Sequence, residues 1–399
     1  MALILLNALS LCCQPQCRGA EDGRWTTAWA TATENIVKNR EYSPKAPLAH
    51  NTYRMFVRTS IGGELLRFRF SNVYGTNSAT INAAHFALAA NVDSSAENGS
   101  INTNSDTAIQ FNGASSVVIP SGETVVSDPV KFALPPLSLV AVSIHYGEIA
   151  NDPITGHRGS RTTSFFKSGN VVSDADMAGA TKQDVWFTLV GMEVMTPMSG
   201  GTIVAIGDSI TDGNSTRYNY HTRWTDFLAT RLSTNSATAG VGVANMGIGA
   251  TGIDLAKSRF QRDVLEQGGA RWVIIFIGVN DIGANRPASF VTSAYTDMAS
   301  RAHARGLKVY GATITPFHGN GYYSEAHEAA RQEVNAWIKT TAITNGVLDG
   351  FMDFSECVTA PGSNPPTLQS TYTGDHLHLN PAGYKALSDG IDLSLFAKP

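Results

Sequence analysis

Near residue 200 the spacing of hydrophobic residues changes, and this change restricts the fold more than any other feature of the sequence. From about Trp25 to Val194 hydrophobic and polar residues tend to alternate, as in LLRFRFSN at 65–72 and LVAVSIHY at 139–146. Alternation with a period of two is typical of strands that bury one face, and turn signals such as FNG and PSGE separate these runs. The pattern predicts an all-β domain over 24–196, folded as a sandwich or jelly roll.

After TPMSGG at 196–201 short hydrophobic runs alternate with longer helical stretches. The predicted strands are 202–207, 241–247, 272–278 and 307–314, and the predicted helices include 222–233, 287–305 and 324–345. Such alternation predicts a parallel sheet covered by helices on both faces, a three-layer αβα domain over 200–399. Ligands of these sheets bind at the carboxyl ends of the strands, so the loops after the first three strands form a candidate site.

Length and charge limit the partners that the chain can have. Its 399 residues are enough for two domains of ordinary size. Lys and Arg number 29 and Asp and Glu number 33, and the resulting net charge of −4 provides no basic field for nucleic acid or anionic lipid. We therefore expect neither nucleic acid nor stable membrane insertion, and the sequence leaves the oligomeric state open.

Residues 1–22, MALILLNALSLCCQPQCRGAED, contain a hydrophobic run that is too short to span a bilayer and suits a signal peptide. We therefore predict a signal peptide over 1–22 and a secreted, periplasmic or cell-surface location. No Lys or Arg precedes the run, so another role, such as a lipid anchor at Cys12, stays open. Without this segment, which also holds Cys13 and Cys17, only Cys357 remains, and a single cysteine forms no internal disulfide.

The loop after the first predicted parallel strand reads GDSITDG, residues 207–213. Gly207 permits a tight exit from the strand, and Ser209 then stands where the next helix begins, with its hydroxyl at the open edge of the sheet. Ser209 is thus a candidate nucleophile. The alternative is that Ser209 only caps the helix, which serine often does.

The loops after the next two strands contribute possible hydrogen-bond donors. NMGIGATG, from Asn245, is rich in small residues that let backbone NH groups approach a ligand, although glycine in a turn needs no such explanation. GVND at 278–281 places Asn280 at a strand end, where its side-chain amide can donate to a developing oxyanion. The alternative for Asn280 is an Asx-turn that closes the loop.

Near the carboxyl end the segment GDHLHLNPAGY holds Asp375 and His378, just before Asn380 and Pro381, which predict a helix N-cap and its first-turn proline. A carboxylate beside an imidazole fixes its tautomer, so that the other ring nitrogen can take a proton from a serine hydroxyl. His376 lies between them and competes for the role, but we expect its side chain to point away from that of His378.

Taken together, these motifs resemble those of the SGNH hydrolases, the GDSL esterase and lipase superfamily, over about residues 201–399. The matching positions are GDS with Ser209, GxND with Gly278, Asn280 and Asp281, and DxxH with Asp375 and His378. The resemblance implies a flavodoxin-like αβα hydrolase domain after the β domain, with a catalytic triad of Ser209, His378 and Asp375. It also implies an oxyanion hole formed by Ser209, Gly249 or Ala250, and Asn280.

One position departs from the family pattern. The family's second block, counted from Asn245, places its oxyanion glycine at Ala250, while Gly249 is adjacent. The contribution is a backbone NH that alanine also supplies, but alanine tolerates a positive φ poorly. The sequence leaves open which of the two donates.

The resemblance implies a serine esterase that needs no cofactor, and the expected substrate is a short-chain, acetyl-type ester on a carbohydrate. Family members also include lipases, lysophospholipases and arylesterases, so the substrate stays open, and a non-catalytic carbohydrate binder is a further alternative. No metal is expected, because HExxH and Cys-rich ligand sets are absent from the sequence. We interpret His221, His303 and His327 as surface or capping residues.

The β domain has two possible roles: a remote sugar-binding or scaffolding module, or one wall of the active-site cleft. In the second case TGHRGSRTTSFF at 155–166 places His157, Arg158 or Arg161 where it could reach a substrate, although a solvated loop is the alternative. With Asp208 of the GDS block, His157 and Arg161 are the candidate substrate-binding residues.

Overall fold

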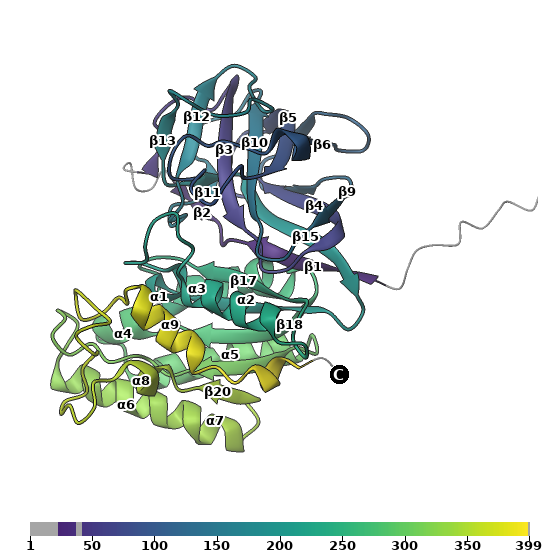
Figure 1. Ribbon diagram of the computed structural model, residues 1–399. Coiled ribbons are helices and arrows are strands. Elements are labelled where there is room, and N and C mark those ends of the chain that lie inside the picture. The colour runs from purple at the N-terminus through teal and green to yellow at the C-terminus, as the bar shows by residue number, and fades with distance from the viewer. Residues whose placement is uncertain (1–22, 37–41, 398–399) are drawn as a thin grey trace, which may run out of the picture.

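The structure is a computed structural model that describes residues 23–36 and 42–397 (Figure 1). The predicted signal peptide over 1–22 lies outside the described residues. Antiparallel sheets occupy the chain up to Pro197, and we call this part the β region. From Gly201 a parallel sheet alternates with helices, and we call this part the α/β region. Figure 1 shows the two regions stacked on one another.

Two antiparallel sheets form a sandwich in the β region. The first is ordered β1 (Gly23–Ala30), β15 (Leu189–Pro197), β4 (Gly63–Ser71), β8 (Thr124–Val126), with β9 (Val130–Leu134) also paired to β4. The second is ordered β13 (Thr181–Gln183), β12 (Ser164–Ser168), β3 (Asn51–Arg58), β10 (Leu139–Tyr146), β5 (Ala79–Leu88), β6 (Thr107–Ile109), with β7 (Val117–Ile119) also paired to β5. Alternate residues of both sheets, such as Phe68 on β4 and Val142 on β10, meet in one hydrophobic cluster, as the period-two pattern predicts.

Strand β10 departs from the predicted burial of one face. Ala141 and Ser143 are buried as well as the alternating Val140, Val142 and Ile144. The cause is a small second cluster on the outer face of the sheet, in which Ala141 packs with residues from strands and loops that cover it. A central strand covered on both sides does not show the strict alternation of a half-exposed one.

A short third sheet lies beside the sandwich, with the order β14 (Trp186–Phe187), β11 (Thr155–His157), β2 (Glu34–Asn35). It matters for function because β11 leads directly into residues 158–163, which we call the β11–β12 loop. This loop carries two of the arginines that the sequence singled out.

The α/β region contains a five-stranded parallel sheet in the order β17 (Val241–Gly247), β16 (Gly201–Gly207), β18 (Ala270–Phe276), β19 (Lys308–Ala312), β20 (Gly350–Met352). Counted along this region, the order is 2-1-3-4-5, which is the flavodoxin-like arrangement. The four predicted strands are present, whereas the sequence analysis did not single out the three-residue β20. The chain reverses its direction of travel across the sheet at β16, so the loop that follows β16 opens at the switch point where ligands bind.

Helices cover this sheet in two layers, and contacts pair α2 with α9 and pair α5 with both α3 and α6. Their bounds are α1 (Ser209–Asp212), α2 (Trp224–Thr234), α3 (Ile253–Phe260), α4 (Val279–Gly283), α5 (Ala288–His303), α6 (Glu325–Lys339), α7 (Thr341–Thr344), α8 (Phe354–Val358) and α9 (Pro381–Asp389). The helix predicted over 324–345 is divided at Thr340, whose φ of −125° and ψ of −76° are not helical. Three-layer packing of this kind confirms the predicted fold class.

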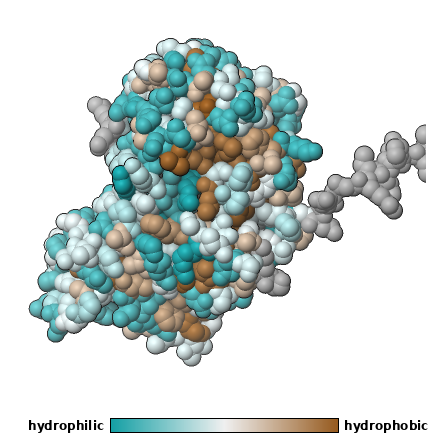
Figure 2. Space-filling view, in the orientation of Figure 1, coloured by the Kyte–Doolittle hydropathy of each residue, from teal (hydrophilic) through white to brown (hydrophobic). Residues whose placement is uncertain are grey.

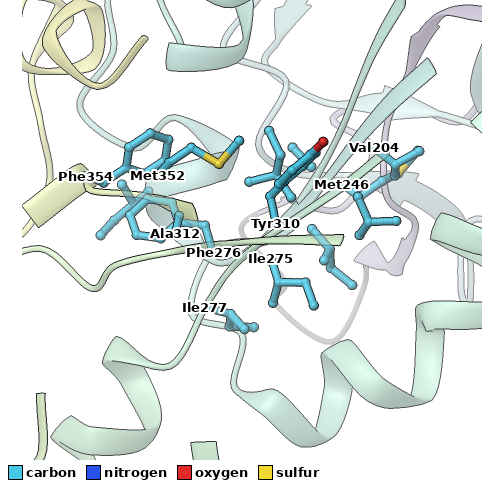
Figure 3. Packing of buried hydrophobic residues seen from close by; sticks show 14 of the residues in the cluster. Val204, Met246, Ile275, Phe276, Ile277, Tyr310, Ala312, Met352 and Phe354 are labelled. Carbon is cyan, nitrogen blue, oxygen red and sulfur yellow. The ribbon is translucent and has the colours of Figure 1, made fainter. Parts of the chain in front are cut away.

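The sheet is held by a continuous hydrophobic core. Figure 3 shows Ile275 and Phe276 of β18 among Tyr310 and Ala312 of β19 and Met352 of β20. Near-continuous burial along β16 and β18 is what a parallel strand between two helical layers requires.

The β region is joined to the edge of the parallel sheet. The Thr27 NH donates to the Gly268 carbonyl at 3.0 Å, and Ser60 Oγ accepts from the Val243 NH of β17 at 3.0 Å. Ala30 and Ala32 belong to the same hydrophobic cluster as the core of the α/β region. The two regions therefore share part of a core rather than being connected only through a linker.

Hydrophobic surface is unevenly distributed on the face drawn in Figure 2, where it gathers over the β region. Within the described residues, no helix is both long and hydrophobic enough to cross a bilayer.

Candidate active site

Ser209 is placed by a tight turn at the end of β16. A Cβ on Gly207 would lie 2.2 Å from Thr211 Oγ1, so only glycine lets α1 fold back so closely on the strand. The N-cap of α1 is Asp208, whose side chain accepts from the Ile210 NH at 2.9 Å. The capping role considered for Ser209 thus belongs to Asp208, and the Ser209 hydroxyl contacts the His378 ring instead.

The three residues predicted as a triad form one chain of contacts. Ser209 Oγ lies 2.9 Å from His378 Nε2, and His378 Nδ1 lies 2.6 Å from Asp375 Oδ2. Because a carboxylate only accepts hydrogen bonds, Nδ1 carries the proton, and the Nε2 lone pair then faces the Ser209 hydroxyl. Ser209 is 7% exposed, so its hydroxyl is shielded but reachable from the cleft.

Asp375 is held as a carboxylate by its own loop. Its Oδ1 accepts from the backbone NH groups of Leu377 and His378 at 3.0 and 2.8 Å. Partial burial raises the pKa of Asp375, but these hydrogen bonds and the one from the His378 ring outweigh it and hold the pKa below its ordinary value. His376 does not compete for the role, because its ring packs against Gly319.

Helix α9 fixes the end of this loop as predicted. The side chain of Asn380 accepts from the NH groups of Ala382 and Gly383, and Pro381 occupies the first turn. The anchored cap explains why the Asp375–His378 loop can hold a fixed geometry at the sheet edge.

Asn280 lies in the first turn of α4 with its amide oriented by two bonds. Its Nδ2 donates to the Thr251 carbonyl at 2.9 Å, and its Oδ1 accepts from the Tyr322 hydroxyl at 3.0 Å. These partners are not those of an Asx-turn, so the structure does not support that alternative. Because Tyr322 holds Oδ1, the amide nitrogen is directed toward the loop that contains Gly249 and Ala250.

Tyr322 is a site residue that sequence reasoning missed. Its ring packs on α4, where a Cβ on Gly283 would lie 2.7 Å from the ring. Tyr322 belongs to a loop after β19 that carries no recognisable sequence motif. Its role in the site is evident only from the hydrogen bond that its hydroxyl donates to Asn280.

The loop after β17 places its positive φ at Ala250, with φ of 57°, whereas Gly249 is not in the left-handed region. The strained backbone position is therefore occupied by alanine and not by the adjacent glycine. Both residues line the cleft beside Ser209 and Asn280.

An open cleft of about 260 Å³ surrounds Ser209 and His378. Its walls come from both regions of the chain: Tyr42, Arg158, Gly159 and Arg161 from the β region, and Ser209, Asp212, Asn214, Gly249, Ala250, Asn280, Tyr322, Leu377 and His378 from the α/β region. Most of these side chains are polar or aromatic. Of the two roles considered for the β region, the structure therefore favours the wall of the cleft.

The three candidate substrate-binding residues lie in different places. Arg161 lines the cleft, with its Nη1 3.3 Å from the Tyr218 hydroxyl. His157 and Asp208 are each 2% exposed, and neither lines the cleft. The expectation that His157 and Asp208 contact substrate is therefore wrong: Asp208 caps α1, and His157 is buried between the two regions.

The sequence analysis interpreted three further histidines, His221, His303 and His327, as surface or capping residues, and the structure places them as follows. His303 pairs with Asp349 near the end of α5, and the His327 NH donates to Ser324 Oγ, the N-cap of α6. His221 is half-buried, with its Nε2 shielded from solvent, and burial lowers the pKa of His221 to about 4. Within residues 23–36 and 42–397, no cluster of three or more His, Cys, Asp or Glu side chains is arranged to hold a metal ion.

A parallel sheet in 2-1-3-4-5 order with serine, asparagine and an Asp-x-x-His pair at its carboxyl edge defines an SGNH hydrolase. Residues 205–386 match the profile of the GDSL-like lipase/acylhydrolase family. Residues 205–386 therefore form a GDSL-like lipase/acylhydrolase domain, and the protein is a carboxylic ester hydrolase.

Solved structures with a similar α/β part include a GDSL-like lipase from Bacteroides thetaiotaomicron VPI-5482, 22% identical, covering 49% of this chain and 87% of its own, with a TM-score of 0.39. A member of the lipolytic protein G-D-S-L family from Veillonella parvula DSM 2008 is 19% identical and covers 47% and 94%, with a TM-score of 0.38. A catalytic mutant of an acetylxylan esterase from Geobacillus stearothermophilus is 19% identical and covers 50% and 95%, with a TM-score of 0.40. No curated protein matches the chain.

Proposed function

We propose that the protein is a serine esterase that removes acetyl or other short acyl groups from carbohydrate, with Ser209, His378 and Asp375 as its catalytic triad. The observation that carries this proposal is the continuous chain of contacts from Ser209 Oγ through the His378 ring to Asp375, at 2.9 and 2.6 Å. Such a chain is the arrangement by which a serine hydroxyl is activated.

In the acylation step the Ser209 oxygen forms a bond to the ester carbonyl carbon while its proton moves to His378 Nε2. The carbonyl oxygen becomes an oxyanion, which meets the Ser209 NH, an NH of Gly249 or Ala250, and the Asn280 amide. As the oxyanion collapses, the C–O bond to the alcohol breaks, and the alcohol oxygen takes the proton from His378. Water then gives a proton to His378 as its oxygen bonds to the acyl carbon. The bond between that carbon and Ser209 Oγ breaks, Oγ takes the proton back from His378, and the acid leaves.

The lining of the cleft supports a small, polar substrate. A long acyl chain needs an extended apolar groove, whereas the side chains around Ser209 include Tyr42, Arg158, Asn214 and Tyr322, and Leu377 is the large aliphatic side chain among the lining residues. Tyrosine offers a sugar ring both an apolar face and a hydroxyl. We also propose that the enzyme is exported, since the amino-terminal sequence suits a signal peptide.

The test is ester hydrolysis across chain lengths. Purified protein is assayed on p-nitrophenyl esters from acetate to palmitate and then for acetate release from acetylated xylan, mannan and pectin, with Ser209→Ala as the blank. We expect the highest kcat/KM on acetate and release from at least one polysaccharide. A preference for long acyl esters points to a lipase or lysophospholipase, and activity confined to aryl esters points to an arylesterase; either result overturns the carbohydrate assignment.

A further inference from the structure

Asp212 joins the two regions directly beneath the candidate nucleophile. It is three residues after Ser209 in the single turn of α1 and is 2% exposed. Its carboxylate contacts two side chains from the β region: Oδ1 lies 2.9 Å from His157 Nε2, and Oδ2 lies 3.5 Å from Arg161 Nη2. The helix that carries Ser209 is therefore held by charges that belong to the other region.

The hydrogen bonds of His157 define its protonation. Its Nδ1 lies 3.0 Å from the Ala32 carbonyl, and its Nε2 lies 2.9 Å from the Asp212 carboxylate. A carbonyl and a carboxylate only accept hydrogen bonds, so with Asp212 ionised both ring nitrogens must donate. His157 is then an imidazolium, paired with a carboxylate in the interior.

Asp212 is ionised because Arg161 and Arg223 place positive charge beside it, whatever the state of His157. Burial raises the pKa of Asp212, but the charges of His157, Arg161 and Arg223 outweigh it and hold the pKa below the ordinary 3.8. Breaking such a buried pair from one side leaves a charge without a partner in the interior, which is strongly unfavourable.

The surroundings keep the pair from moving. The Trp186 ring stacks on the His157 ring with centroids 5.8 Å apart and an interplanar angle of 24°. Arg223, at the N-cap of α2, donates through Nε to the Asp212 carbonyl and through Nη2 to the Gly159 and Ser160 carbonyls at 2.8, 2.8 and 2.9 Å. A Cβ on Gly159 would lie 2.2 Å from both Asp212 carboxylate oxygens, so the β11–β12 loop packs directly on the carboxylate.

We propose that His157 is a positioning residue: through its ion pair with Asp212 it fixes α1, and thereby the Ser209 hydroxyl, against His378. The β region then completes the catalytic geometry as well as lining the cleft. The inference rests on the proposed function, because it takes Ser209 as the nucleophile. His157 itself touches no reacting atom, so its loss affects the rate of attack rather than the binding of substrate.

The test compares His157→Leu, His157→Gln and a matched control, His85→Leu, in the full chain. His85 also pairs with an aspartate, its Nδ1 lying 2.9 Å from Asp106 Oδ2, but it lies on β5 of the sandwich and its side chain is 24% exposed. For each variant kcat and KM on p-nitrophenyl acetate are measured, together with the rate of fluorophosphonate labelling and the melting temperature. Glutamine can still donate an amide NH toward Asp212, whereas leucine cannot.

We expect His157→Leu to lower kcat and the labelling rate by about 100-fold, the size of effect that a displacement of about 1 Å produces, with KM within about threefold of wild type. His157→Gln should recover part of both rates, and His85→Leu should leave both unchanged. If His157→Leu does not fold, the test uses His157→Gln, for which we expect a lower kcat with KM close to that of wild type.

A folded His157→Leu variant with wild-type kcat and labelling rate overturns the inference. So does a variant that changes KM alone, because this would make His157 a substrate contact. If wild-type protein itself neither labels at Ser209 nor hydrolyses esters, the proposed function fails instead, and the two failures are thereby distinguished.

Discussion

Two histidine–aspartate pairs flank α1, and they differ in almost every physical respect. His378 and Asp375 lie three residues apart in one loop, with the Asp375 side chain 47% exposed. His157 and Asp212 lie 55 residues apart in different regions, and each side chain is 3% exposed. The first pair is open to substrate and solvent, as proton transfer requires, while the second is closed and holds a fixed charge.

The difference shows that the same two residue types serve two purposes, which their surroundings decide. A ring nitrogen that faces a hydroxyl can accept its proton, as His378 Nε2 can from Ser209. A ring whose two nitrogens both face acceptors, as in His157, has no lone pair to offer and can only hold its neighbours in place.

The largest effect is expected from the exposed pair. Replacing His378 by alanine removes the group that takes the Ser209 proton, so kcat on p-nitrophenyl acetate should fall by about 10⁴-fold or more. The melting temperature should change little, because His378 lies at the rim of the cleft. A His378→Ala variant that retains a tenth of wild-type kcat would mean that this pair is not the catalytic one.

The next effect concerns the oxyanion. Asn280→Ala removes the side-chain amide that we expect to donate to the oxyanion. The substitution should lower kcat by about 10²- to 10³-fold with little change in KM. Tyr322→Phe removes only the hydrogen bond that orients the amide, so its effect on kcat should be smaller and in the same direction. Steady-state kinetics of the two variants side by side measure this order, and a larger loss in Tyr322→Phe would contradict it.

A smaller effect is expected from Asp208, a third carboxyl beside Ser209. It is as buried as Asp212, but it accepts from the Ile210 NH rather than from a cation. Burial raises the pKa of Asp208 to about 7. The ionised form is therefore disfavoured in the fold, and the stability that Asp208 contributes at low pH is lost as pH rises from its ordinary 3.8 toward 7.

Asparagine keeps the capping oxygen and cannot ionise. Asp208→Asn should therefore melt higher than wild type at about pH 8, by about 2 to 4 °C, and the difference should shrink at about pH 4. Thermal unfolding at the two pH values measures this. A difference that grows toward low pH would reverse the sign and refute the assignment.

The smallest effect is expected at Ala250, where the backbone is left-handed with φ of 57°. Ala250→Gly relieves that strain and should raise the free energy of unfolding by about 1 kcal/mol, less the entropy that glycine loses on folding. If the donor is only a backbone NH, kcat should stay within about twofold. Denaturant unfolding and steady-state kinetics test both parts, and a lower stability would show that the loop is not strained.

What could be predicted from the sequence was the part encoded by local pattern. The strands that precede the site loops are short hydrophobic runs, and Asp375 and His378 lie three residues apart in the segment whose resemblance to the SGNH hydrolases implied their pairing. The cap at Asn380 followed in the same way, because Asn-Pro marks the first turn of a helix.

The rest depended on packing between segments far apart in sequence. Nothing near His157 shows that Asp212 and the Ala32 carbonyl will enclose its ring, and nothing near Tyr322 shows that its hydroxyl will reach Asn280. Capping of α1 by Ser209 was kept as an alternative in the sequence analysis, and the structure gives that role to Asp208, because serine and aspartate both cap helices and the sequence does not distinguish them.

The most direct measurement is covalent labelling of the wild-type protein with a fluorophosphonate, followed by mass mapping of the modified residue. We predict a single modification on Ser209, which is abolished in Ser209→Ala and strongly slowed in His378→Ala. A folded wild-type protein that remains unlabelled, or that is labelled at another residue while Ser209 stays free, would contradict a nucleophile at position 209.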